Sequence, residues 1–233
     1  MKKLTLIFSL FLFSSSLFAG SWGYLNLVEG WKLNNDYTGI NGTAMTWIGS
    51  PSFSATPVPL PSDPACSRVN GGMAATPPSL GATMNALSAW TIVWYLNIPV
   101  GTAANKILFN STGDWVYGNW YVGDVRLNGQ VGTGIVPTLG AWQEWRVEWT
   151  GVGGAMNLYI DRQLVCSVAR ATNPFPTNTS FYFRHTIGID SGVWFVDDVF
   201  FFSVALGTDV IPYKYLSDQY FFDNMIYFDT NYQ

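Results

Sequence analysis

The sequence contains little charge, since only 11% of its 233 residues are Asp, Glu, Lys or Arg and its formal charge is −4. Proteins that bind nucleic acid neutralise phosphates with many Lys and Arg side chains, so this composition argues against such a partner. Histidine and cysteine are also scarce, with a single His185 and two cysteines, Cys66 and Cys166. A structural zinc site takes four Cys or His ligands and is therefore excluded.

Long apolar runs are missing except at the N-terminus. Met1-Lys2-Lys3 precedes a nearly apolar run, Leu4 to Phe13, and three serines then lead to Ala19-Gly20. This order predicts a secretory signal peptide over residues 1–19, after which no membrane-spanning segment remains. The alternative, an uncleaved anchor, has a run that is short for a span of about 20 residues. We expect a secreted protein, extracellular or periplasmic, from a bacterium, with a formal charge of −6 once the two lysines are removed.

The two cysteines leave two interpretations open. In an oxidising compartment, Cys66 and Cys166 are candidates for a disulfide that closes a long loop and stabilises by roughly 4 kcal/mol. The alternative is a pair of buried thiols that never meet.

Aromatic residues, by contrast, make up 17% of the chain and recur in alternating runs. Side chains of a strand alternate between its two faces, so the run 142–149 places three apolar residues on one face and three charged residues on the other. The apolar residues are Trp145, Val147 and Trp149, and the charged ones are Glu144, Arg146 and Glu148. This pattern predicts antiparallel sheet with one buried face.

Turn-forming residues separate many such segments, which favours an all-β protein. The predicted strands are Tyr24–Leu33, Thr43–Ile48, Ala89–Ile98, Lys106–Asn110, Asp114–Val122, Trp142–Trp149, Met156–Ile160, Leu164–Val168, Ser180–Ile187 and Val193–Phe202. Many short strands without a long helical period indicate a two-sheet sandwich or a barrel. The Pro- and Ser-rich stretch 51–78 is expected to be a long surface excursion, and only 206–216 has the pattern of a helical turn or two.

A weak internal echo links residues 194–202 to residues 220–228, since both read aromatic, aromatic, apolar, Asp, Asp or Asn, then apolar. It is either chance or the mark of a second closing strand. In the second case the aromatic tail, residues 212–233, would pair at a sheet edge of this molecule or of a neighbour.

Five motifs in order resemble the laminin-G-like group of the concanavalin-A-like lectins and glucanases. They are Trp31-Lys32-Leu33 with its loop to Thr43, Trp90-Thr91-Ile92-Val93-Trp94-Tyr95, Trp142 with Trp145-Arg146-Val147, Leu158-Tyr159-Ile160-Asp161 with Leu164-Val165, and Gly192 through Asp197-Asp198-Val199 to Leu206. The resemblance implies an antiparallel jelly-roll β-sandwich over residues 20–211. Arg162 departs from it, because the hairpin normally has Gly there, and we expect a different turn type.

The resemblance also implies calcium on oxygen-rich loops. The candidate ligands are Asp36, Asn41, Asp190 and Asp197. The same side chains can instead cap turns through hydrogen bonds.

Carboxylate pairs raise the alternative of a glycan-degrading enzyme. Glu144 and Glu148 share a face but lie roughly 13 Å apart along an extended strand, too far for a glycosidase pair. Arg146 between them predicts a charge ladder, and Asp197 and Asp198 point to opposite faces unless a bulge intervenes. His185 has no nucleophile arrangement near it and is expected to be structural. We therefore expect no catalysis.

Sugar recognition suits the remaining residues, because aromatic rings stack on pyranose faces while Asp and Asn bond hydroxyls. The candidate carbohydrate-binding residues are Asp114, Trp115, Tyr117, Asn119, Trp120, Tyr121 and Tyr95. The competing interpretation is that these rings pack the core. The sequence predicts a secreted, lectin-like protein that binds a glycan or surface polymer, and the alternative is a self-associating structural subunit or adhesin.

Overall fold

The computed structural model describes residues 26–33, 37–48, 52–54, 66–70, 73–101, 105–110, 113–119, 124–128, 130–132, 135–177, 180–183 and 193–208. The predicted signal peptide, His185 and the aromatic tail lie outside these ranges. In the described part of the chain, no helix is both long and apolar enough to cross a bilayer.

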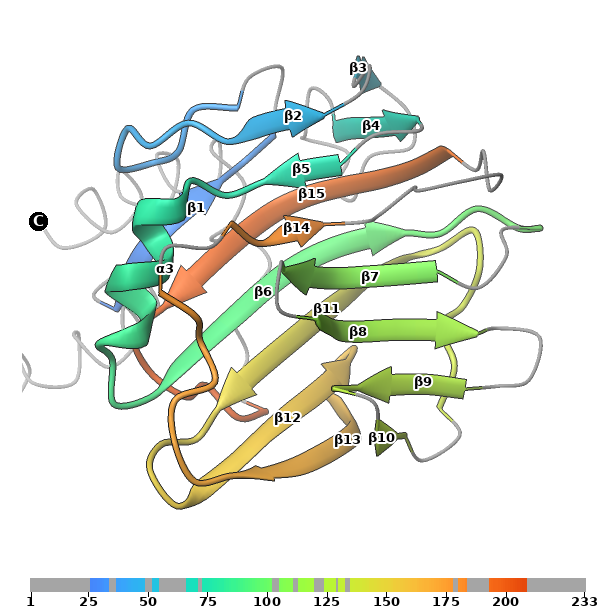
Figure 1. The fold of residues 1–233 in the computed structure, drawn as a ribbon. Coiled ribbons are helices and arrows are strands. Elements are labelled where there is room, and N and C mark those ends of the chain that lie inside the picture. The colour runs from blue at the N-terminus through green and yellow to red at the C-terminus, as the bar shows by residue number, and fades with distance from the viewer. Residues whose placement is uncertain are drawn as a thin grey trace, which may run out of the picture.

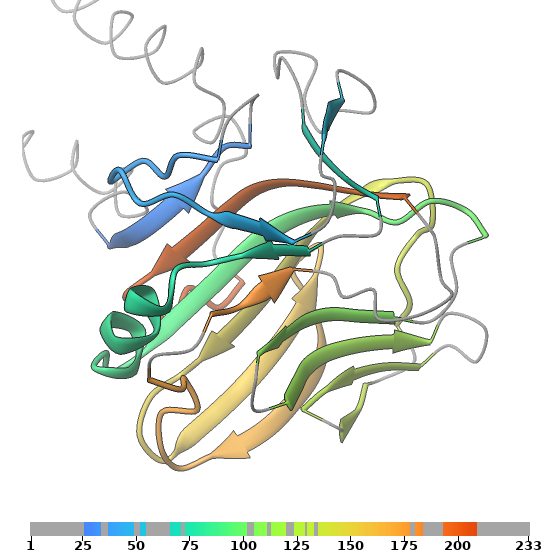
Figure 2. The ribbon, with the colours of Figure 1, turned by 45° about the horizontal axis from the view of Figure 1, so that its top comes forward.

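Two antiparallel sheets form the molecule (Figures 1 and 2). The eight-stranded sheet contains β1 (Leu27–Trp31), β3 (Ser52–Ser54), β4 (Cys66–Asn70), β6 (Trp90–Asn97), β11 (Trp142–Trp149), β12 (Gly154–Ile160), β13 (Gln163–Arg170) and β15 (Val193–Phe202). The seven-stranded sheet contains β2 (Thr46–Ile48), β5 (Met73–Ala75), β7 (Asn105–Asn110), β8 (Gly113–Asn119), β9 (Asp124–Leu127), β10 (Gln130–Val131) and β14 (Tyr182–Phe183). The predicted β-sandwich is confirmed at this level.

The order of the eight-stranded sheet is β13-β12-β11-β6-β15-β4-β3, with β1 added to β15. β6, β11 and β15 therefore occupy its middle. The short helix α3 (Pro78–Asn85) precedes β6 and lies at one end of the sandwich (Figure 1). It begins with a proline whose fixed φ suits the first helical position, and it buries Leu80 and Met84, which are one turn apart.

Tryptophan rings fill the space between the sheets. Trp145, Val147 and Trp149 are at most 1% exposed and belong to one apolar cluster with Trp90 and Trp94. Trp94 stacks on Trp145 across adjacent strands, with ring centroids 6.2 Å apart. Since each fully buried large side chain contributes roughly 2–3 kcal/mol, this layer is the main stabilising element. The inner face predicted from the alternation of β11 is confirmed.

The stretch 51–78 is not the strandless excursion that its composition predicts, because β3, β4 and β5 lie within it. β4 pairs with β15 through Trp194↔Val69 and Phe195↔Arg68, and β3 pairs with β4. These short strands are defined by the neighbours to which they bond, since their own sequences have little alternation. The sequence analysis also missed α3, because a helix of eight residues is too short to have a long periodic pattern of apolar residues.

The arrangement of the strands contradicts the candidate disulfide. Cys66 begins β4 and Cys166 lies in β13, and β15, β6, β11 and β12 separate these two strands in one sheet. Five strand spacings correspond to about 24 Å, whereas a disulfide needs Cα atoms within about 7 Å. Cys166 is a buried thiol in the core cluster, and burial raises the pKa of that thiol.

Candidate functional site on the outer face of the eight-stranded sheet

The outer face of the eight-stranded sheet, which points away from the seven-stranded sheet, carries the polar residues at the middle of the fold. Opposed residues of antiparallel strands point to the same face. Tyr95 of β6 opposes Glu144 of β11 on one side and Asp197 of β15 on the other. These three side chains therefore form one row across three strands, and each is at most 8% exposed.

A β-bulge in β15 determines which face its two aspartates reach. Asp197 opposes Tyr95 and Phe200 opposes Val93, so Asp198 and Val199 of β15 lie opposite the single residue Trp94 of β6. Asp198 has a φ of +46°, a left-handed conformation that is uncommon for a residue with a Cβ. The sequence predicts that Asp197 and Asp198 point to opposite faces unless a bulge intervenes, and the structure has that bulge. Asp198 Oδ1 lies 3.5 Å from Nζ of Lys32, the residue after β1, and Lys32 also lies over the Phe200 ring of this face.

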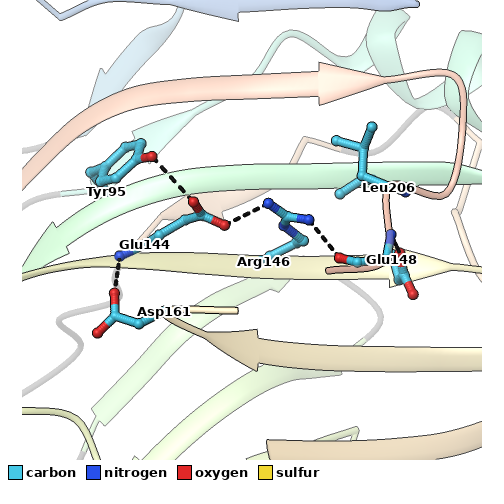
Figure 3. Close-up of polar contacts among 8 residues, drawn as sticks. Tyr95, Glu144, Arg146, Glu148, Asp161 and Leu206 are labelled. Carbon is cyan, nitrogen blue, oxygen red and sulfur yellow. Dashed lines mark hydrogen bonds and ion pairs between the residues drawn. The ribbon is translucent and has the colours of Figure 1, made fainter. Parts of the chain in front are cut away.

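Arg146 is the centre of a hydrogen-bonded network on this face (Figure 3). Its Nη2 donates to Glu144 Oε1 at 2.7 Å, and its Nη1 donates to the Gly207 carbonyl at 2.5 Å. The Tyr95 hydroxyl donates to the other Glu144 oxygen at 3.3 Å. Arg146 is fully buried, so its guanidinium is held by these partners and not by water. The charge ladder predicted between Arg146 and Glu144 is confirmed.

Glu148 continues the network along β11 and across β12. Its Oε2 accepts from the Gly207 amide at 2.7 Å, and its Oε1 accepts from the Tyr159 hydroxyl at 2.8 Å and from Asn157 Nδ2 at 3.0 Å. Burial and the hydrogen bond to Glu148 raise the pKa of Tyr159 to about 12. Both glutamates of β11 therefore accept hydrogen bonds within the protein, and these bonds link β11 to β12 and to the segment after β15.

The β12–β13 hairpin supports the same network from the side. Asp161 and Arg162 form its two-residue turn, with φ of +48° and +67°, as in a type I′ turn. The expectation that Arg162 changes the turn type is wrong, because Arg162 adopts the left-handed conformation that Gly would adopt. Asp161 Oδ1 accepts from the Glu144 amide at 2.9 Å (Figure 3). Asp161 Oδ2 accepts from Gln143 Nε2 at 2.7 Å.

The segment 203–208, which follows β15, folds back over the network. Thr91 Oγ1 donates to the Val204 carbonyl at 2.8 Å and accepts from the Leu206 amide at 3.0 Å. Gly207 then bonds both Arg146 and Glu148 through its carbonyl and amide. This segment closes the end of the outer face at which Thr91 and Glu148 lie.

The opposite end of the outer face is more open. Trp142 of β11 and Phe195 of β15 both oppose Asn97 of β6, which gives a row of two partly exposed rings with an amide between them. The Asn97 amide donates to the Gly140 carbonyl at 3.3 Å. Within the described part of the chain, the buried indole N–H of Trp142 has no hydrogen-bond partner. We call Trp142, Asn97 and Phe195 the aromatic row; it lies next to the row of Glu144, Tyr95 and Asp197.

Two of the predicted carbohydrate-binding residues, Trp115 and Tyr95, have described side chains, and these two lie in different sheets. Trp115 of β8 is 5% exposed and stacks on Trp90 in the core, with centroids 5.6 Å apart, so the packing interpretation holds for it. Tyr95 lies on the outer face of the other sheet. Asp114, Tyr117 and Asn119 belong to β8, while Trp120 and Tyr121 fall outside the described residues. The aromatic row was missed because its three members are distant in sequence.

Two of the predicted metal ligands, Asn41 and Asp197, lie within the described residues, and each makes hydrogen bonds within the protein. Asn41 stabilises a turn, since its Nδ2 donates to the Val28 carbonyl and its amide donates to Glu29 Oε1. Asp197 is buried in β15, and its Oδ1 accepts from the Asp198 amide at 3.0 Å. Asp36 and Asp190 lie outside the described residues. Across the described ranges, no group of three or more His, Cys, Asp or Glu could hold a metal ion.

No family model matches the chain, and no curated protein matches its sequence. Solved structures nevertheless share its fold. One is domain 4 of AbnA, an extracellular arabinanase of glycoside hydrolase family 43 from Geobacillus stearothermophilus, in complex with arabinotriose; it is 14% identical, with a TM-score of 0.59, and 83% of this chain covers 98% of that one.

Two further neighbours belong to larger proteins. Trypanosoma rangeli sialidase is 12% identical with a TM-score of 0.59, over 87% of this chain and 33% of that one. A structure of botulinum neurotoxin type C, whose cell entry depends on two ganglioside molecules, is 11% identical with a TM-score of 0.53, over 78% of this chain and 49% of that one. The chain thus spans about a third of the sialidase and about half of the toxin chain. At such low identity, the likeness shows a β-sandwich fold alone.

Proposed function

We propose that this protein is a secreted, non-catalytic carbohydrate-binding protein with a laminin-G-like jelly roll over residues 20–211. The observation that carries the proposal is the aromatic row: two partly exposed rings flank a buried amide on the outer face. Opposed strands lie about 5 Å apart, so Trp142 and Phe195 are separated by roughly 10 Å at their Cα atoms. That spacing accommodates one or two sugar rings.

The chemistry of the row suits a sugar. A pyranose has one face of C–H groups that stacks on an aromatic ring, and Trp142 and Phe195 each have a partly exposed ring. The Asn97 amide retains further donor and acceptor capacity beyond its bond to Gly140. Tyr95 and Glu144 of the neighbouring row are held in place by Arg146, and such fixed polar groups give a binding site its specificity.

The structural neighbours support the proposal without identifying the ligand. Two of the three neighbours interact with sugars: the arabinanase domain is in complex with arabinotriose, and cell entry of the toxin depends on two ganglioside molecules. Those sugars differ in charge and size, so the common element is the fold. The sialidase shows that the fold also occurs in enzymes. Our proposal of a non-catalytic role rests on Glu144 and Glu148, whose oxygens accept hydrogen bonds from Arg146, Tyr159 and the backbone.

A glycan array tests the proposal. The mature chain is applied with and without a chelator, beside Trp142→Ala and the matched control Tyr182→Ala, which removes a partly exposed ring from β14 of the other sheet. We expect binding that survives the chelator, falls at least tenfold in Trp142→Ala and is unchanged in Tyr182→Ala, with unchanged far-UV circular dichroism. Loss with the chelator alone would favour the calcium loops instead.

Two results would overturn the proposal. One is the absence of any bound glycan in both conditions. The other is release of reducing sugar from a bound polysaccharide, which would show catalysis. A Trp142→Ala variant that binds as well as the parent would move the site away from the aromatic row.

A further inference from the structure

The turn between β12 and β13, formed by Asp161 and Arg162, lies beside the aromatic row. The Asp161 amide donates to the Glu144 carbonyl at 2.8 Å, which fixes the turn against β11. Trp142 of the aromatic row is two residues from Glu144 on the same face of β11, roughly 7 Å along the strand. The turn therefore stands next to the Trp142 end of the proposed sugar site.

The two residues of this turn have different roles. Both carboxylate oxygens of Asp161 accept hydrogen bonds from β11, one from the Glu144 amide and the other from Gln143 Nε2. Arg162 is exposed, and within the described part of the chain its side chain makes no hydrogen bond and no ion pair. Asp161 thus holds the turn in place, whereas the Arg162 guanidinium contributes no polar contact to the fold.

Arg162 occupies a backbone position that is unfavourable for an arginine. Its φ of +67° lies in the left-handed region, which residues with a Cβ enter at a cost in energy. The second position of a type I′ turn is often glycine, because glycine adopts this conformation without strain. Strained residues cluster at functional sites, so a strained residue whose side chain does not support the fold is a candidate for ligand binding.

A guanidinium beside the aromatic row suits a sugar that carries a carboxylate. Its planar donors match the two oxygens of a carboxylate, and it keeps its charge throughout the physiological pH range. Arg146, the nearby cation of β11, is fully buried and donates to Glu144. Arg146 is therefore not accessible to a ligand, and a carboxylate on a sugar at Trp142 needs a different cation.

We propose that Arg162 binds the carboxylate of an acidic sugar whose ring stacks on Trp142. This inference rests on the proposed function and adds to it the class of ligand, a glycan that contains uronic acid. A charge-assisted hydrogen bond of this kind contributes about tenfold or more to affinity. The strained conformation of Arg162 is then a loss of stability that is retained for binding.

Three pairs of soluble polymers test the class of ligand. Each pair consists of a neutral β-glucan, galactan or mannan and the same polymer after oxidation of C6 to a carboxylate, so the two members differ in charge. We expect the mature chain to bind at least one oxidised polymer about tenfold more tightly than its neutral form in about 20 mM salt. The difference should shrink in about 500 mM salt, because salt screens the ion pair.

Neutral polymers that bind as tightly as their oxidised forms, or more tightly, would overturn this inference and leave the proposed function standing. Binding of none of the six polymers would also overturn the assigned class of ligand, whereas the glycan array decides the proposed function separately.

Variants of Arg162 locate the contact. Arg162→Gln removes the charge, and we expect it to abolish the preference for the oxidised polymer. Arg162→Lys keeps the charge and should retain part of the preference. The matched control is Arg126→Gln, which removes an exposed cation from β9 of the other sheet and should leave the preference unchanged. An unchanged preference in Arg162→Gln would refute the contact.

Arg162→Gly separates a binding role from a structural one. We expect this variant to unfold at a higher urea concentration than the parent, because glycine relieves the strain, and yet to lose the preference for the oxidised polymer. A structural role of the Arg162 side chain would produce the opposite change in stability. A more stable Arg162→Gly variant that retains the full preference would overturn the proposal.

Discussion

Replacement of Arg146 by Met examines the buried network directly. The guanidinium is fully buried and donates to Glu144 and to the Gly207 carbonyl. Met retains most of the apolar volume but leaves the Glu144 carboxylate, whose side chain is only 10% exposed, without its cation. Removal of one partner of a buried ion pair costs about 3–5 kcal/mol. Glu144 keeps its bond from Tyr95, so we expect about 3 kcal/mol.

The assay is urea unfolding of the mature chain, followed by tryptophan fluorescence. A loss of about 3 kcal/mol would lower the thermal midpoint by roughly 6–12 °C for a domain of this size. The double variant Glu144→Leu with Arg146→Met separates the lost pair from lost packing, because a buried pair replaced by apolar residues is often neutral in stability. We expect the double variant to recover most of the loss. A single Arg146→Met change below 1 kcal/mol, or a double variant as unstable as the sum of both singles, would refute the buried-pair explanation.

Two further predictions concern the neighbouring strands. Arg162→Gly should raise the free energy of unfolding by up to about 1 kcal/mol, because Arg162 has a φ of +67° and glycine adopts that conformation without strain. The greater freedom of glycine in the unfolded chain offsets part of this gain. Equal or lower stability of the variant in urea unfolding would contradict the prediction. Tyr159 has a folded pKa of about 12 against an ordinary value of 10.0, so the unfolded chain loses this proton first and stability should fall as pH rises from about 10 to 12. Unfolding at several alkaline pH values should show a steeper loss in the parent than in Tyr159→Phe, and parallel curves would reject the assignment.

Much of the sandwich could be predicted from the sequence, because alternation is a local property. In β11 and β6, residues two apart share a face, so the apolar inner face could be recognised without knowing the partner strands. The strands at Trp142–Trp149 and Val193–Phe202 have the predicted bounds. Short strands such as β3 and β5 could not be recognised in this way, since three residues contain too little alternation and their pairing partners are distant in sequence.

Cross-strand neighbours and one-residue shifts of register were decided by the tertiary structure alone. The sequence indicated aromatic residues in 114–121 as a sugar site, but the packing of the two sheets places Trp115 in the core beside Trp90. It also indicated a solvated charged face on β11, whereas Glu144, Arg146 and Glu148 are all buried and Gly207 bonds two of them. The bulge at Asp198 and the row of Trp142, Asn97 and Phe195 depend on which residues oppose each other between strands. Local periodicity determined which side chains turn inward, whereas long-range pairing determined which of the outward-facing ones meet, because a strand's own sequence does not specify its neighbours.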